Sequence, residues 1–120
     1  MKLLKNNADY DYLKKLSSHG LVFLLKHSFT CPISASAKKI FEEFYSKHQD
    51  IPCFILNIQE TKNLSNQISE QTGISHESPQ VLVFKDGSVI FNEDHQKITL
   101  DVLEEVISNN SEQKPDENQT

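Results

Sequence analysis

Long apolar runs are absent from this chain, and their absence excludes several classes of protein. The densest apolar run is Leu21–Leu25, far shorter than the ~20 residues that a membrane-spanning helix needs. Residues 1–7 contain no apolar stretch of the length that a secretory signal peptide requires. We therefore predict that the protein has no membrane partner.

Cysteine and positive charge are also scarce. The 2 cysteines among 120 residues are too few for the disulfide framework of a small secreted protein. The net charge of −5 at pH 7 argues against nucleic acid as a partner, because nucleic-acid binding needs a basic face. Together these features predict a cytoplasmic protein in a reducing environment, where an exposed cysteine is more often catalytic than structural.

The rest of the composition is that of one globular domain. Apolar residues make up 37% of the chain, an ordinary value for a domain with a single core. From residue 109 onward the chain is polar and contains Pro115 but no apolar residue. We predict one domain over residues 1–108 and a disordered polar tail over residues 109–120.

Helical and strand patterns alternate along this domain. Apolar residues recur three and four apart, as in half-buried helices, in residues 8–19, in residues 32–47, between Thr61 and Gly73, and after Thr99. Gly20 is the expected terminator of the first helix. Short apolar runs predict strands at residues 21–25, 51–58, 81–84 and 89–91, with a short outer strand at Leu3-Leu4.

The connections between these segments predict the fold class. Asp86-Gly87 is a strong hairpin signal, so the strands on either side of it should be antiparallel. Neighbouring strands that are joined through a helix should instead be parallel. The chain is therefore predicted to be α/β, with a central mixed sheet of four or five strands flanked by helices.

Cys31 stands where a buried strand gives way to a helix that begins at Pro32. Unpaired backbone N–H groups and the positive end of the helix dipole favour the thiolate there, and the thiolate is the reactive species. The carboxyl ends of the strands in an open α/β sheet are also where ligands bind. We predict that Cys31 is a nucleophile rather than an inert buried cysteine.

Neither Ser34 nor Cys53 is expected to form a disulfide with Cys31. Ser34 stands where a dithiol oxidoreductase carries its second cysteine. Its hydroxyl cannot form a disulfide, but it either donates a hydrogen bond to the thiolate or merely tolerates the first helical turn. Cys53 lies near the start of its strand, ~15 Å from the carboxyl end, whereas a disulfide needs Cα atoms within ~7 Å. We expect Cys53 to be a core residue.

The basic residues near Cys31 have more than one open role. His27 precedes Cys31 by four residues and either approaches it or, as we expect, only shapes the end of the strand. Lys26, Lys38 and Lys39 either supply positive charge to the site or remain solvated on the surface. The 5 histidines show no metal-ligand spacing, so we predict no metal.

Taken in order, these segments resemble the thioredoxin superfamily over residues 8–108. The matching features are the strand Leu21–Lys26, the motif Cys31-Pro32-Ile33-Ser34, and the stretch from Ser78-Pro79 to Asp86-Gly87. The resemblance implies a thioredoxin-like fold in which Pro79 is cis and packs beside the cysteine, and in which the backbone of Ser78 pairs with bound substrate. The dithiol thioredoxins carry a buried acid six residues before the first cysteine, where this chain has Leu25.

More narrowly, Lys26-His27-Ser28 and Thr30-Cys31-Pro32-Ile33-Ser34 are similar to the monothiol bacilliredoxins of bacteria that use bacillithiol as their small thiol. The resemblance implies a thiol-disulfide oxidoreductase that removes bacillithiol from S-bacillithiolated client proteins through a mixed disulfide on Cys31. Bacillithiol would be a co-substrate, with no tightly bound cofactor, and a flavoprotein disulfide reductase system would be a further partner. Thr30, Pro32 and Ser34 would support the thiolate, and Ser78 and Pro79 would bind substrate.

Two other functions are weighed against this one. Monothiol glutaredoxins, which carry iron–sulfur clusters, typically have Gly-Phe between the cysteine and the serine and Gly-Gly after the hairpin. This chain has Pro32-Ile33 and Phe91-Asn92-Glu93-Asp94 at those places. The other alternative is a redox-inert thioredoxin-like module that binds partners through the groove at Pro79.

Overall fold

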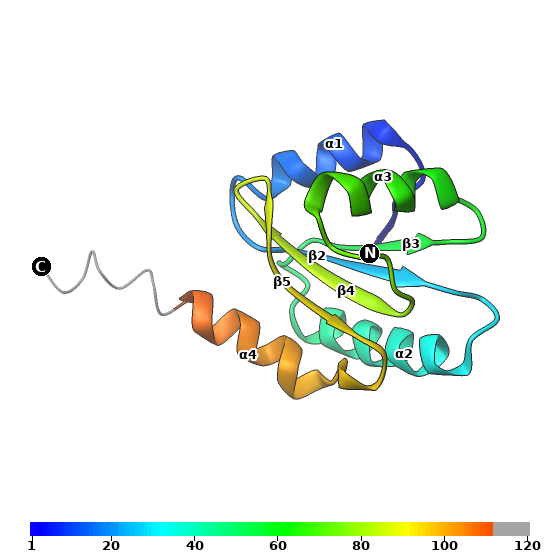
Figure 1. Cartoon of the computed structure of the whole chain (residues 1–120). Helices are drawn as coiled ribbons and strands as arrows, with labels where there is room; N and C mark the ends of the chain where they lie inside the picture. The colour runs from blue at the N-terminus through cyan, green and yellow to red at the C-terminus, as the bar shows by residue number, and fades with distance from the viewer. Residues whose placement is uncertain (112–120) are drawn as a thin grey trace, which may run out of the picture.

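A five-stranded mixed sheet forms the centre of the protein, with helices on both faces (Figure 1). The computed structural model describes residues 1–111, so most of the predicted tail lies outside the described residues. The strands are β1 (Lys2–Leu3), β2 (Val22–His27), β3 (Cys53–Asn57), β4 (Gln80–Lys85) and β5 (Ser88–Asp94), in the spatial order β1-β3-β2-β4-β5. Helices α1 (Asn7–Leu16) and α3 (Lys62–Thr72) cover one face of the sheet, and α2 (Pro32–Lys47) and α4 (Leu100–Ser111) cover the other. The predicted fold class is confirmed, with the outer strand making the fifth.

The two faces of the sheet bury separate apolar clusters. On β2, Phe23 and Leu25 pack in the cluster that includes α2 and α4, whereas Val22 and Leu24 pack in the cluster that includes α1 and α3. Every residue of β2 is buried, as is nearly all of β4. Burial on both faces explains why the sequences of these strands are continuously apolar rather than alternating.

The pairing of β2 brings three chain segments to one edge of the sheet. β2 runs parallel to β3, from the pair Phe23 and Cys53 to the pair His27 and Asn57. β4 follows α3 in the chain but pairs with β2, antiparallel, and not with β3. The carboxyl ends of β2 and β3 and the amino end of β4 therefore lie side by side.

Most helix ends agree with the sequence signals. α2 spans the predicted residues 32–47, and Gly73 ends α3 with a left-handed φ of 74°. Asp86 and Gly87 have φ values of 53° and 79° in the predicted hairpin turn. α4 continues to Ser111, three residues into the segment that was predicted as tail.

The end of α1 was predicted wrongly. The helix stops at Leu16 and not at the residue before Gly20. The hydroxyl of Ser17 donates to the carbonyl oxygen of Lys14 at 2.6 Å, which helps to end the helix. Ser17 is fully buried, and its hydroxyl also accepts the N–H of Gly87 at 2.8 Å, so a contact with the distant hairpin fixes this end.

Phe41 lies on the inner face of α2 and is fully buried in the core. We expect Phe41→Ala to lower the free energy of unfolding by about 3–5 kcal/mol, because it leaves a cavity under the helix. Urea denaturation followed by circular dichroism measures the loss. Lys39→Ala, at an exposed position of the same helix, should change that free energy by less than about 0.5 kcal/mol. Equal losses in the two variants would contradict the packing described here.

Candidate active site

Cys31 lies at the junction between the loop that follows β2 and the first residue of α2. It is the N-cap residue of α2, with an extended backbone, and its side chain makes no capping hydrogen bond. Its carbonyl oxygen accepts the N–H of Ala35 at 3.1 Å, so the helical hydrogen bonds begin at this residue. Cys31 is partly exposed and is not in a disulfide. The side chain is therefore open to reaction at the amino end of a helix, where a negative charge is favoured.

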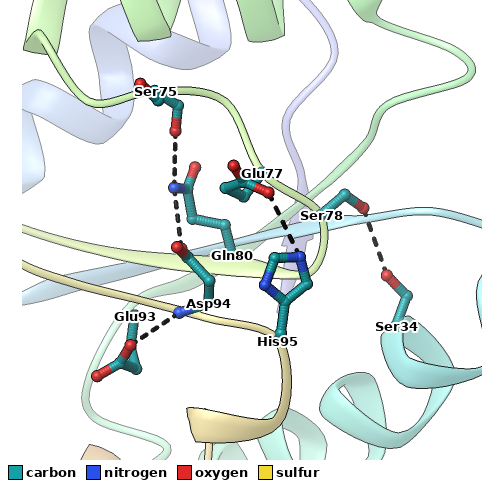
Figure 2. Close-up of polar contacts among 8 residues, drawn as sticks. All are labelled: Ser34, Ser75, Glu77, Ser78, Gln80, Glu93, Asp94 and His95. Carbon is teal, nitrogen blue, oxygen red and sulfur yellow. Dashed lines mark hydrogen bonds and ion pairs between the residues drawn. The ribbon is translucent and has the colours of Figure 1, made fainter.

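Ser34 connects the first turn of α2 to two neighbouring loops. Its side chain is fully buried, and its hydroxyl accepts the N–H of Ser28 at 3.2 Å. The same hydroxyl lies 3.4 Å from that of Ser78, as Figure 2 shows. Within residues 1–111 no hydrogen bond joins Ser34 to Cys31. Its support of the thiolate therefore stays a prediction, whereas its role as a tie between loops is observed.

The predicted groove residues lie against this first turn. The peptide bond between Ser78 and Pro79 is cis, as the superfamily resemblance implied. Pro79 is buried and Ser78 is partly exposed. Thr30 and Pro32, on either side of the cysteine, are both exposed, and the hydroxyl of Thr30 lies 3.2 Å from that of Ser28. All the predicted site residues are thus on the same edge of the sheet.

Polar side chains that the sequence analysis did not single out hold the loop before β4 in place (Figure 2). The side-chain amide of Gln80 donates to the carbonyl oxygen of Ser75 at 3.0 Å and to the carboxylate of Asp94 at 3.1 Å. Nε2 of His95 lies 3.4 Å from the carboxylate of Glu77. The one available signal was Gln80 itself, a polar residue in a run that is otherwise apolar.

A second missed residue, Gln59, fixes the loop before the cysteine. Its side-chain oxygen accepts the N–H of Phe29 at 3.1 Å, and its side-chain nitrogen donates to the hydroxyl of Ser28 at 2.9 Å. The loop is thereby tied to the segment that follows β3. Phe29 is 55% exposed, which leaves an apolar ring two residues before Cys31.

His27 is a buried residue at the end of β2, in agreement with the expected structural role. Burial and the nearby Lys38 lower the pKa of its imidazole, against smaller opposite effects of the Ser34 backbone and of Glu42. Its Nδ1 is buried and makes no hydrogen bond within the described residues. Because the lowered pKa favours the neutral form at pH 7, His27 is poorly suited to supply positive charge to the site.

Of the two roles left open for Lys26, a solvated position on the surface is wrong. The side chain is fully buried, and its Nζ donates to the carbonyl oxygen of Ser65 on α3 at 3.3 Å. The alternation of side chains along β2 sends it to the α3 face, the same face that buries Leu24. Lys38 is partly exposed and Lys39 is exposed.

Cys53 is a core residue, as predicted. It pairs with Phe23, four residues before the end of β2, which places it ~13 Å from that end at ~3.3 Å per residue. Its exposed fraction is 3%, and burial raises the pKa of its thiol to about 12. Cys53 therefore remains a protonated thiol in the interior, separated from the loop that carries Cys31.

Residues 1–111 contain neither a cluster of metal-binding side chains nor a membrane-spanning helix. No group of three or more histidine, cysteine or acidic side chains is gathered as it would be around a metal ion. No helix in this part of the chain has the length and apolar character to cross a membrane.

The chain matches known proteins along most of its length. The family model described as monothiol bacilliredoxin BrxC matches residues 2–103. A solved structure described as a proposed oxidoreductase with a thioredoxin fold is 34% identical, with 86% of this chain and 89% of that chain covered and a TM-score of 0.78. The thioredoxin of Fasciola hepatica is 14% identical, with 91% and 98% covered and a TM-score of 0.73. Thioredoxin f2 of Chlamydomonas reinhardtii is 14% identical, with 92% and 95% covered and a TM-score of 0.73.

The observed role of Ser34 generates a stability prediction. Ser34→Ala removes the acceptor of the buried Ser28 N–H, so we expect the free energy of unfolding to fall by about 1–3 kcal/mol. Ser78→Ala removes only the 3.4 Å contact between hydroxyls, and we expect a loss of less than about 1 kcal/mol. Urea denaturation compares the two variants, and a larger loss for Ser78→Ala would show that the tie through Ser34 is assigned incorrectly.

Proposed function

The chain belongs to the monothiol bacilliredoxin family, and on this premise we propose that it removes bacillithiol from S-bacillithiolated client proteins in the cytoplasm. The observation that carries the proposal is the contrast between its two cysteines. Cys31 is partly exposed at the amino end of α2, whereas Cys53 is buried in β3. Only one sulfur is therefore placed to exchange disulfides.

The first step transfers bacillithiol to the protein. The Cys31 thiolate attacks the bacillithiol sulfur of the mixed disulfide that joins bacillithiol to a client cysteine. A bond forms between Cys31 Sγ and that sulfur, the bond to the client sulfur breaks, and the client leaves as a thiolate. The client is reduced, and Cys31 is left as its S-bacillithiol mixed disulfide.

The second step requires an external thiol, because this chain supplies no resolving cysteine. Ser34 has a hydroxyl at the position of the second thiol, and Cys53 lies in the core. A second bacillithiol thiolate attacks the bacillithiol sulfur on Cys31, which releases oxidised bacillithiol and the Cys31 thiolate. A flavoprotein disulfide reductase system would then reduce the oxidised bacillithiol, with no cofactor bound by this chain itself.

We place the substrate-binding groove between the cysteine and the loop before β4. The hydroxyls of Ser34 and Ser78 are 3.4 Å apart, so the loop that carries Ser78 and Pro79 is next to the first turn of α2. We assign the backbone of Ser78 to pairing with the client and Pro79 to shaping the groove. Phe29 adds an exposed apolar surface for contact with the client.

Removal of one sulfur at a time tests the proposed reaction. A client protein bacillithiolated on one cysteine is incubated with the wild type, Cys31→Ala or Cys53→Ala, and the intact masses of both proteins are followed. We expect the wild type and Cys53→Ala to restore the client and to gain the mass of bacillithiol, and Cys31→Ala to do neither. If Cys31→Ala removes the modification as well as the wild type does, the protein acts through another group. If the wild type does not remove it, the protein is a redox-inert module.

A second thiol in the motif tests the geometry. Residues three apart at the start of a helix lie on the same side, so we expect Ser34→Cys to form a disulfide with Cys31 on mild oxidation and to shorten the lifetime of the mixed disulfide. Mass spectrometry of the unreduced digest identifies the bond. Ser78→Cys, which introduces a thiol outside the motif Cys31-Pro32-Ile33-Ser34, is oxidised and digested in the same way for comparison. Absence of a bond between Cys31 and the thiol that Ser34→Cys introduces would contradict the proposed geometry.

A further inference from the structure

A pocket beside the loop that carries Cys31 is lined by groups that the exchange reaction does not use. Its volume is about 260 Å³, and its lining consists of residues that follow β3, of the first turns of α3, and of the loop before Ser78: Ile58, Gln59, Lys62, Ser65, Asn66 and His76. We propose that this pocket is a subsite for the carboxylate-bearing end of the small thiol, which under the proposed function is the malyl group of bacillithiol.

A buried cation, Lys26, lies behind the wall of the pocket. Lys26 is fully buried, and its Nζ lies 3.3 Å from the carbonyl oxygen of Ser65 and 3.4 Å from Nδ1 of His76, both of which are lining residues. No ion pair formed within residues 1–111 includes it. Burial lowers its pKa to about 8, so at pH 7 it is still mostly an ammonium ion. A buried charge of this kind is normally paired, and an anion in the adjoining pocket would supply the missing partner.

His76 contributes a hydrogen-bond donor to the pocket. Its Nδ1 lies within reach of Lys26 Nζ at 3.4 Å and of the hydroxyl of Ser65 at 2.9 Å. An ammonium group can only donate, so Nδ1 is the acceptor and the proton of the neutral ring is on Nε2. Burial and Lys26 lower the pKa of the ring, against a smaller opposite effect of Glu77, and favour this neutral form. His76 therefore offers an N–H donor from Nε2.

A second cation, Lys62, lies at the start of α3. Lys62 is its first residue, is exposed, and forms no ion pair within the described residues. The N-cap residue Thr61 does not cap the helix with its side chain, which donates instead to the carbonyl oxygen of Asn57 at 2.9 Å. Of these residues Lys62 lines the pocket, where its ammonium group is available to an anion.

Glu60 and Glu77, the acids that follow the lining residues Gln59 and His76 in the chain, have other partners. Glu60 accepts a hydrogen bond from the side-chain amide of Asn57 at 3.3 Å. Glu77 lies 3.4 Å from the imidazole of His95. Within the described residues, neither Lys26 nor Lys62 forms an ion pair with a carboxylate.

The pocket adjoins the loop that carries the reacting sulfur. Gln59 lines it and also bonds the N–H of Phe29 and the hydroxyl of Ser28. Phe29 precedes Cys31 by two residues, so their Cα atoms are at most ~7 Å apart at ~3.6 Å per residue. A small thiol that spans this distance would present its own sulfur to Cys31. The subsite would therefore direct attack to the bacillithiol sulfur of a mixed disulfide and not to the client sulfur.

Two probes that differ only in the malyl group test the proposal on the full-length protein. The probes are oxidised bacillithiol and the disulfide of cysteinyl-glucosamine, and the measurement is the second-order rate constant of Cys31 adduct formation by quenched intact mass. For Lys62→Glu we expect a loss of about tenfold with oxidised bacillithiol and a change of less than about twofold with the probe that lacks malate. Lys15→Glu, which makes the same charge change at an exposed position of α1, should leave both rates within about twofold of the wild type.

The outcomes separate the subsite from the reaction. If the wild type restores a bacillithiolated client but Lys62→Glu reacts with both probes as the wild type does, or if Lys15→Glu slows oxidised bacillithiol equally, the subsite is overturned and the proposed function stands. If the wild type does not restore the client, the proposed function fails. Binding of L-malate alone then decides on the pocket: shifts of the His76 ring signals in NMR spectra support it, and unchanged signals overturn it.

Discussion

The position of β2 at the middle of the sheet is the constraint on which the site depends. This strand pairs with β3 on one side and with β4 on the other, so its carboxyl end opens between the segments that follow β3 and precede β4. Burial on both faces requires an apolar strand with a fixed register, since a shift of one residue would exchange the two clusters. The loop that leaves β2 therefore emerges in one place, and Cys31 with it.

Hydrogen bonds from polar side chains then fix that loop and its neighbours. Ser34, in the first turn of α2, accepts the N–H of Ser28 in the loop that follows β2. Gln59, which follows β3, forms hydrogen bonds with the same loop. Gln80 holds the segment before β4 through a carbonyl oxygen and a carboxylate. Ser34 and the amide nitrogen of Gln80 would be costly to bury without their partners, so these partners also help to define the shape of the site.

The sequence predicted the parts of the molecule that follow from local chemistry. Periodicity and end signals placed α2 and α3, and Asp86-Gly87 placed the hairpin, because each of these depends on residues that are close in the chain. Cys31 was found for the same reason, as a residue at the junction of a strand and a helix. The distance from Cys53 to the carboxyl end of its strand also indicated that this residue lies in the core, away from that junction.

Contacts between distant residues were not predictable in this way. The early end of α1 depends on the hairpin whose Gly87 N–H donates to the hydroxyl of Ser17. The buried position of Lys26 depends on α3, which covers that face of β2. Gln59 and Gln80 act through partners that only the folded sheet brings near. Such tertiary partners override local propensity without leaving a pattern in the sequence.

The burial of Cys53 has a consequence for any chemical study of the folded protein. Its thiol is both covered and held in the protonated form, whereas Cys31 is partly exposed. Maleimides, iodoacetamide and oxidants that act on thiolates will therefore modify a single position while the fold persists. A fluorophore or spin label can be attached at Cys31 without first replacing the other cysteine, and the appearance of a second labelled site would report unfolding.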